Sequence, residues 1–120
     1  MIEGLFNGTN YLAARKLLDA AVLRHEALAG NLANLETPGY QRVDLAPSFA
    51  AQLQEALAAG SPQRISQLQP QLAPDRAAGP VNLETELAQL QQNTLTHNLA
   101  TQLISARLLR LRLAITGRAT

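Results

Sequence analysis

The chain has 120 residues, and its 10 Lys and Arg residues nearly balance its 9 Asp and Glu residues, for a formal net charge of +1. This length and balance allow one domain at most and exclude both a uniformly basic nucleic-acid coat protein and an acidic solvating tail. Hydrophobic residues make up 47% of the chain and charged residues only 16%, against about 25% in an ordinary soluble domain, so we expect the chain to bury surface against other chains.

The first eight residues have neither a basic start nor a long apolar run, so we expect no cleavable secretory signal. The most apolar stretch, residues 99–115, is interrupted by Arg107, Arg110 and Arg112. A membrane-spanning helix needs about 20 mostly uncharged residues. We therefore expect no membrane span.

Residues 9–35 have the apolar spacing of a long helix. Their apolar positions alternate by three and four residues, which is the pattern of a coiled-coil seam. The seam consists of Tyr11, Ala14, Leu18, Ala21, His25, Leu28, Leu32 and Leu35. Thr37 precedes Pro38, and the residue before a proline disfavours helical geometry, so we expect the helix to end before this pair.

Residues 36–81 hold all six prolines and divide into two parts. The first part, residues 36–60, is predicted to be a turn followed by a short helix between Pro47 and Gly60. Phe49, Leu53 and Leu57 fall on one face of that helix. The second part, residues 61–81, is rich in Gln, Pro, Ala and Ser and is predicted to be a flexible loop.

Residues 82–116 are predicted to form a second long helix, with Asn82 as its N-cap and Gly117 as its left-handed terminating residue. Its seam again alternates by four and three residues and consists of Leu83, Leu87, Leu90, Thr94, His97, Thr101, Ile104, Leu108, Leu111 and Ile115. A second apolar stripe falls on roughly the opposite face, at Leu95, Leu99, Leu103, Ala106, Leu109 and Leu113. One helix can cover only one stripe, so we expect neighbouring subunits to cover the second.

Together these elements predict an all-α fold in a single domain, residues 1–120. Its two long terminal helices pack as a coiled-coil-like hairpin, and a turn, a short helix and a Pro/Gln-rich loop join them. A two-helix hairpin has a small core, so we expect the isolated chain to be marginally stable and to gain stability on assembly.

The end of the first helix carries the most specific motif, N-L-A-N-L-E-T-P-G-Y at residues 31–40. Pro38 and Gly39 fit the two central positions of a type II turn, in which glycine supplies the positive φ. Asn31 and Asn34 lie three residues apart, on the side of the helix away from the predicted seam. They are either solvent-facing residues near a helix end or hydrogen-bonding residues that dock a loop or another subunit, and the motif favours the second alternative.

This motif resembles the signature N-x-A-N-x-x-T-P-G-Y, which the axial proteins of the bacterial flagellum carry after a long N-terminal helix. The chain length, the central loop and the closing helix that begins V-N-L-E-T-E-L make the chain most similar to the FlgB-type proximal rod proteins of the flagellar basal body. The similarity covers residues 10–58 and 80–116, whereas residues 61–79 match nothing specific.

The resemblance implies a structural subunit of the flagellar basal-body proximal rod, which self-assembles with other rod proteins into the hollow drive shaft that transmits torque. It implies as partners copies of this chain, other rod proteins, membrane-ring or export-gate adaptor proteins, and the flagellar type III export apparatus. It places the protein in the periplasmic rod, exported without a cleaved signal peptide. The expected subunit-interface residues combine the motif with the second stripe: Asn31, Asn34, Thr37, Pro38, Gly39, Tyr40, Leu95, Leu99, Leu103, Leu109 and Leu113.

The alternative is a helical interaction module such as a flagellar export adaptor or chaperone, although chaperones are usually more acidic. A small DNA-binding protein is a third class, because Arg107, Arg110, Arg112 and Arg118 give the last 14 residues a charge of +4 and leave −3 on the rest. No aromatic base-stacking side chains accompany these arginines. We expect them instead to pair with acidic residues of a neighbouring copy, such as Glu84 or Glu86.

The sequence offers no catalytic, cofactor-binding or metal-binding residues, so we expect no enzyme activity and no cofactor. The chain has no cysteine, which excludes disulfides and thiolate ligands, and it has neither a nucleophile–base pair nor a phosphate-binding loop. His25 and His97 lie on the two seams without clustered carboxylates, so we interpret them as seam residues. Thr94 and Thr101 are either a polar layer that sets helix register or hydroxyls that bond to the preceding turn.

Overall fold

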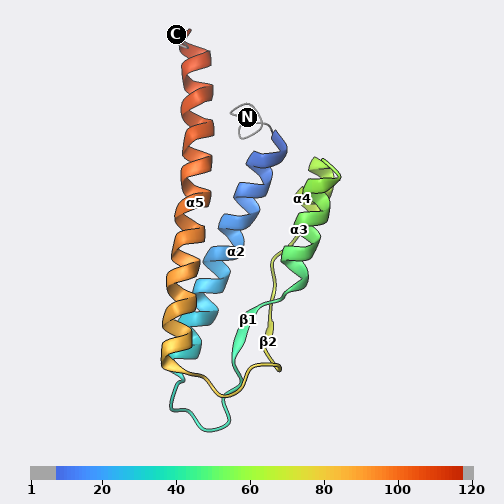
Figure 1. Ribbon diagram of the computed structural model, residues 1–120. Coiled ribbons are helices and arrows are strands. Elements are labelled where there is room, and N and C mark those ends of the chain that lie inside the picture. The colour runs from blue at the N-terminus through green and yellow to red at the C-terminus, as the bar shows by residue number, and fades with distance from the viewer. Residues whose placement is uncertain (1–7, 118–120) are drawn as a thin grey trace.

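The computed structural model describes residues 8–117, and most of these residues are helical. The elements in chain order are α2 (Gly8–Ala33), β1 (Val43–Leu45), α3 (Ser48–Ala58), α4 (Pro62–Gln67), β2 (Leu72–Pro74) and α5 (Leu83–Thr116). α2 lies between α5 on one side and the pair of α3 and α4 on the other (Figure 1). The molecule measures 60 × 27 × 20 Å, and its radius of gyration of 17.3 Å exceeds the roughly 13 to 14 Å of a compact domain of this size. The extra length comes from α5, whose C-terminal end extends past both α2 and α3 (Figure 1).

The two long helices pair along their length in antiparallel directions, as the sequence predicts (Figure 1). Three of the predicted seam positions of α2, Ala14, Ala21 and Leu28, are buried and repeat every seven residues. The small alanines let the helices approach closely, and the Ala21 carbonyl accepts a hydrogen bond from Asn93 Nδ2 of α5 at 2.7 Å. His25 is exposed, so its placement in the seam is wrong.

The predicted seam of α5 is wrong in its register. The positions buried in α5 are Glu86, Asn93 and Ala100, again seven residues apart, whereas Leu87 and Leu108 are about half exposed. The apolar pattern of the sequence does not predict this register, because two of the buried residues are polar. Glu86 and Asn93 find hydrogen-bond partners inside the chain, and these bonds offset the cost of burying them.

The predicted short helix is confirmed as α3, which packs with α4 against the other face of α2. Phe49 and Leu53 are buried there, and Gly60 follows the end of the helix with a φ of 62°. The buried members of this hydrophobic cluster are Ala13, Ala20, Phe49, Leu53, Ala56 and Ile65.

The fold is not strictly all-α, because residues 36–81 contain two short strands. β1 and β2 pair in antiparallel directions, with Val43 opposite Pro74 and Leu45 opposite Leu72. The Asp75 N–H donates to the carbonyl of residue 42 at 2.8 Å and continues the pairing beyond the strands. The two strands can pair because the chain is extended after the turn that follows α2 and is also extended around Pro74, where proline favours extended geometry.

The prediction of a flexible loop over residues 61–81 is wrong where that segment forms α4 and β2. The Ser61 hydroxyl oxygen caps α4 by accepting a backbone N–H three residues on, and Pro62 occupies the first turn, where its missing N–H costs little. Ile65 is fully buried in the cluster with α2 and α3. Lys16 Nζ donates to the Leu68 carbonyl at 2.7 Å. The Ser61 cap and the buried Ile65 side chain therefore stabilise a helix in a segment whose average composition is typical of a loop.

Both predicted ends of α5 are confirmed. Asn82 Oδ1 accepts the Thr85 N–H at 3.1 Å, and Gly117 has a φ of 72°. The predicted end of the first helix is two residues too late, because α2 stops at Ala33 and the chain enters a turn.

Candidate functional site: a polar clasp and an exposed leucine face

Asn31, in the last turn of α2, is completely buried. Its Oδ1 accepts the Val43 N–H at 2.9 Å and the Tyr40 hydroxyl at 3.2 Å. Its Nδ2 donates to the Val43 carbonyl at 2.7 Å and to Glu86 Oε1 at 3.0 Å. The two donors and the two acceptor positions of this amide are all used. One side chain therefore joins α2, the turn, β1 and α5.

The turn that follows α2 has the predicted type II features. The Tyr40 N–H donates to the Thr37 carbonyl at 3.2 Å, and Gly39 has a φ of 74°. Asn34 Nδ2 donates to a carbonyl one helical turn earlier at 2.8 Å, and its Oδ1 accepts the Thr37 hydroxyl at 3.1 Å. The two asparagines therefore hydrogen-bond to the turn of their own chain, which is the second of the two alternatives. The prediction that Asn31 lies away from the contact between the two long helices is wrong, because Asn31 bonds to Glu86 of α5.

A buried ion pair lies beside Asn31. Arg42 Nε donates to Glu86 Oε2 at 2.6 Å, and the two side chains are 5% and 1% exposed. Arg42 Nη1 also donates to Asp44 at 3.1 Å and to Asp75 at 2.8 Å. Burial opposes the charge on Arg42, but the hydrogen bonds and charges of Glu86 and Asp44 outweigh it and hold the pKa of the guanidinium above its ordinary value.

Asp44 extends the ion pairing to α2. Arg24 Nε donates to Asp44 Oδ1 at 2.8 Å, and Arg24 also hydrogen-bonds Gln89 of α5. Burial opposes the charge on Asp44, but the hydrogen bonds from Arg24 and the Leu45 N–H, with the nearby positive charges, hold the pKa of this carboxyl below its ordinary value.

We call Asn31, Arg42, Asp44, Asp75 and Glu86 the polar clasp. The motif in the sequence points to Asn31. The expected pairing of Glu86 with an arginine of another copy is wrong, because Glu86 is buried against Arg42 of its own chain. Arg42, Asp44 and Asp75 were not predicted as site residues. The only signal for the first two is their spacing of two residues, which places both side chains on the same face of an extended segment.

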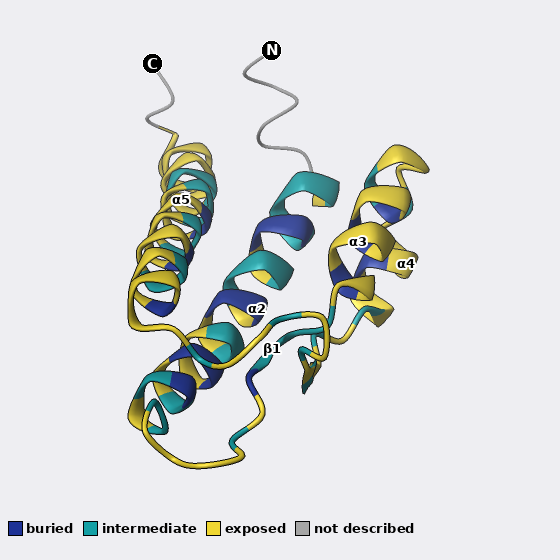
Figure 2. Cartoon of the chain, turned by 60° about the horizontal axis from the view of Figure 1, so that its bottom comes forward, coloured by how far each residue is buried: buried dark blue, intermediate teal, exposed yellow. Residues whose placement is uncertain are grey.

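The second stripe of α5 is exposed at four of its six positions. Leu95, Leu99, Leu109 and Leu113, which we call the leucine face, are 69, 57, 56 and 38% exposed. Leu103 and Ala106 are half-buried. Exposed residues dominate the outer side of α5, in contrast to the buried residues along α2 (Figure 2). Large exposed apolar side chains gathered on one side of a helix make that side a candidate interaction surface.

The two histidines line a groove beside the contact of α2 and α5. This groove has a volume of about 400 Å³, and its other lining residues are Ala21, Val22, Glu26, Asn93 and Thr94. We call it the histidine groove. Within residues 8–117, no three His, Asp or Glu side chains gather in a way that could hold a metal ion.

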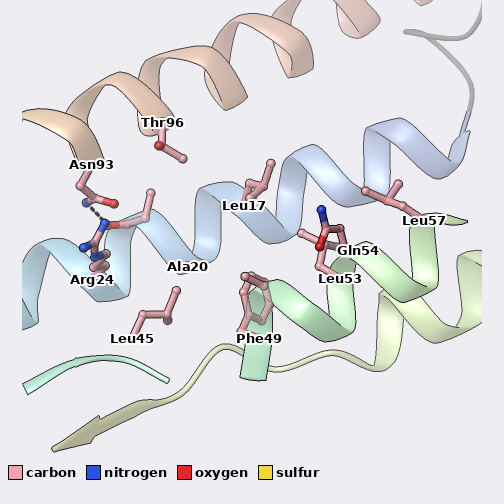
Figure 3. Close-up of a pocket in the computed structure, with 12 residues that line it drawn as sticks. Leu17, Ala20, Arg24, Leu45, Phe49, Leu53, Gln54, Leu57, Asn93 and Thr96 are labelled. Carbon is pink, nitrogen blue, oxygen red and sulfur yellow. Dashed lines mark hydrogen bonds between the residues drawn. The ribbon is translucent and has the colours of Figure 1, made fainter. Parts of the chain in front are cut away.

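A second groove lies on the other side of the α2–α5 contact, where α3 forms its far wall (Figure 3). Its volume is about 360 Å³, and apolar side chains such as Leu17, Phe49 and Leu53 line it. Arg24 is the only charged residue among the described residues that line it, and this guanidinium is already paired with Asp44. We call it the α3 groove.

The hydroxyls of Thr94 and Thr101 donate to carbonyls one turn earlier in α5, at 3.0 and 2.8 Å, and both residues are exposed. These threonines therefore bond to the preceding turn of their own helix and do not form a polar layer between the helices. The Arg107 guanidinium lies 5.3 Å from the centre of the Tyr11 ring, so it contacts its own chain. The predictions for residues 1–7 and for Arg118 lie outside the described residues.

In the part of the chain that the structure describes, no helix combines the length and the apolar character needed to cross a membrane. No protein-family model matches the sequence, and no curated protein matches it either.

Proposed function

We propose that this protein is a structural subunit of the flagellar proximal rod, which self-assembles with copies of itself and with other rod proteins. The observation that carries the proposal is the leucine face. Four leucines of one helix remain between 38 and 69% exposed, on the side turned away from α2. Fully burying one leucine is worth about 1.5 to 3 kcal/mol, so covering this face supplies several kcal/mol toward association.

The shape of the molecule supports the same proposal. α5 extends past the other elements of residues 8–117, so its C-terminal end is available to neighbours along the long axis (Figure 1). The N-terminal half of α5, in contrast, is fixed to α2 and β1 by the polar clasp. One end of the molecule is thus stabilised by buried polar contacts, whereas the apolar end of α5 projects from it. This arrangement suits an elongated assembly.

The motif at residues 31–40, which resembles the signature of flagellar axial proteins, has a defined structural task. Asn31 and Tyr40 bond to each other and fix the turn against β1 and α5. The motif therefore stabilises the contact between α2, β1 and the N-terminal end of α5. In the proposed role the protein is exported by the flagellar type III apparatus to the periplasmic rod, where membrane-ring or export-gate adaptor proteins are further neighbours.

The test is deletion of the gene in the bacterium that encodes the chain, with gold-labelled antibodies against the chain on isolated basal bodies. We expect loss of swimming and label at the rod. The Leu109→Asp variant should be secreted but should not restore swimming, whereas Ser105→Asp, an exposed polar position on the same helix, should restore it. Normal swimming without the gene, or basal bodies that carry no label, would contradict the proposal.

A further inference from the structure

We propose that the histidine groove is the docking site for the C-terminal half of α5 from a second copy of this chain. The inference rests on the proposed self-assembly and names the two surfaces that meet.

The histidine groove offers exposed apolar surface. Val22 of α2 lines it and is 49% exposed. Leu87 lies seven residues before Thr94 on the same face of α5 and is 47% exposed. A cavity of about 150 Å³ accepts a benzene ring, so a groove of about 400 Å³ has room for at least two leucine side chains. The groove is thus large enough for one face of a helix.

The C-terminal half of α5 matches this groove in chemistry. Leu109 and Leu113 lie four residues apart on one helix face, and Arg112 is their neighbour on the surface. Residues 99–116 include three arginines and no acidic residue. Glu26 lines the groove and is exposed. The two leucines therefore meet the apolar part of the wall, Ala21 and Val22, while an arginine meets a carboxylate, which favours association and fixes its register.

The α3 groove is a poorer match for the same helix. Within residues 8–117 its only charged lining residue is Arg24, whose guanidinium is paired with Asp44 inside the chain. An arginine-rich helix would find no carboxylate there to pair with. Charge therefore selects the histidine groove over the α3 groove.

The two surfaces lie at different places on the chain, which determines the kind of assembly. Val22 and His97 lie near the middle of the helical pair, and Leu109 and Leu113 lie on the projecting end of α5. A contact between two different surfaces is heterologous, so each added copy leaves one groove and one helix end free for the next. Such a contact builds a ring where its rotation closes and an open filament where it does not, whereas pairing of two leucine faces with each other would close as a dimer.

Because the chain has no cysteine, single introduced cysteines report the contact directly. The full-length variants Val22→Cys and Leu109→Cys, carrying tags of different size, are mixed and oxidised. We expect a disulfide between the two variants and little disulfide within either variant alone. Ala51→Cys, an exposed position on α3, is the matched control and should not link to Leu109→Cys.

Charge reversal tests the pairing of Glu26 with an arginine. In sedimentation-velocity runs we expect the unaltered chain to form a fast-sedimenting species. Glu26→Arg and Arg112→Glu should each abolish this species, and the chain that carries both changes should recover it. Circular dichroism of each variant verifies that the helices remain folded.

The outcomes separate this inference from the proposed function. Assembly that persists in Glu26→Arg, without a link between positions 22 and 109, overturns the docking site and leaves self-assembly standing. A strong link between two Leu109→Cys chains identifies a closed contact of leucine faces and also overturns it. An unaltered chain that stays monomeric at every concentration overturns both proposals.

Discussion

Asn31 and Glu86 meet across the two long helices although 55 residues separate them in the chain. Asn31 Nδ2 donates to Glu86 Oε1 at 3.0 Å, and neither side chain is exposed to solvent. A buried carboxylate requires partners for both oxygens, and Arg42 supplies the second at 2.6 Å. This contact holds the closed end of the hairpin, from which the rest of α5 extends.

Replacing Asn31 by alanine should destabilise the chain by about 2 to 4 kcal/mol, because the Val43 N–H and Glu86 lose a partner and each unpaired buried group costs about 1 to 3 kcal/mol. Asn34→Ala is the matched control and should cost less than about 1 kcal/mol, since Asn34 is half-buried and water can replace its bonds. Urea unfolding followed by circular dichroism measures both. Equal losses in the two variants would contradict the central role of Asn31.

Arg42→Met should cost about 3 to 5 kcal/mol in the same urea measurement, because it leaves the Glu86 carboxylate buried without its cation. Glu86→Gln keeps an oxygen that accepts from Asn31 but removes the charge. The chain with both changes should therefore be more stable than Arg42→Met alone. Strictly additive losses would show that the two residues do not depend on each other.

The parts of the fold that were predicted correctly depend on local chemistry. A proline–glycine pair defines the turn after α2, Asn82 and Gly117 mark the ends of α5, and Gly60 closes α3. Each of these signals acts within a few residues of the backbone that it shapes, so the sequence shows it directly.

The polar clasp and the register of α5 could not be predicted in the same way. Burial of Glu86 is unfavourable until Arg42, 44 residues away, is known to face it. The apolar pattern of the sequence therefore favours Leu87 as a seam residue, although this leucine remains about half exposed. Ile65 was not predicted as a core residue, because it is a single apolar residue in a polar segment. Its burial stabilises α4 although the segment has no periodic apolar pattern.

The pKa of Asp44 is below its ordinary value in the folded chain, so the ionised carboxylate stabilises the fold at neutral pH. The unfolded chain binds the proton more readily, near the ordinary aspartate pKa of about 3.9. This contribution should therefore be lost as the pH falls below about 4. Asp44→Asn should be less stable than the unaltered chain by about 1 to 3 kcal/mol at pH 7, and the difference should shrink at pH 3. A constant difference in urea midpoints across this range would contradict the assignment.

Gly39→Ala should cost about 1 to 2 kcal/mol, because a residue with a side chain is strained at a φ of 74°. A Cβ at this position would meet nothing within 4 Å, so the cost comes from the backbone alone. Gly79→Ala, which also has open space around the added Cβ but no positive φ, should be neutral or slightly stabilising. Thermal unfolding that ranks the two variants in the opposite order would contradict a turn set by Gly39.

In the proposed assembly, other copies of the chain, and not the chain's own elements, cover the leucine face. Leu99→Cys and Leu109→Cys introduce single thiols into a chain without cysteine, and the rate of maleimide labelling reports their exposure. We expect rapid labelling of the dilute monomer and at least tenfold slower labelling of the assembled protein. Slow labelling of the monomer, or equally rapid labelling after assembly, would contradict the claim.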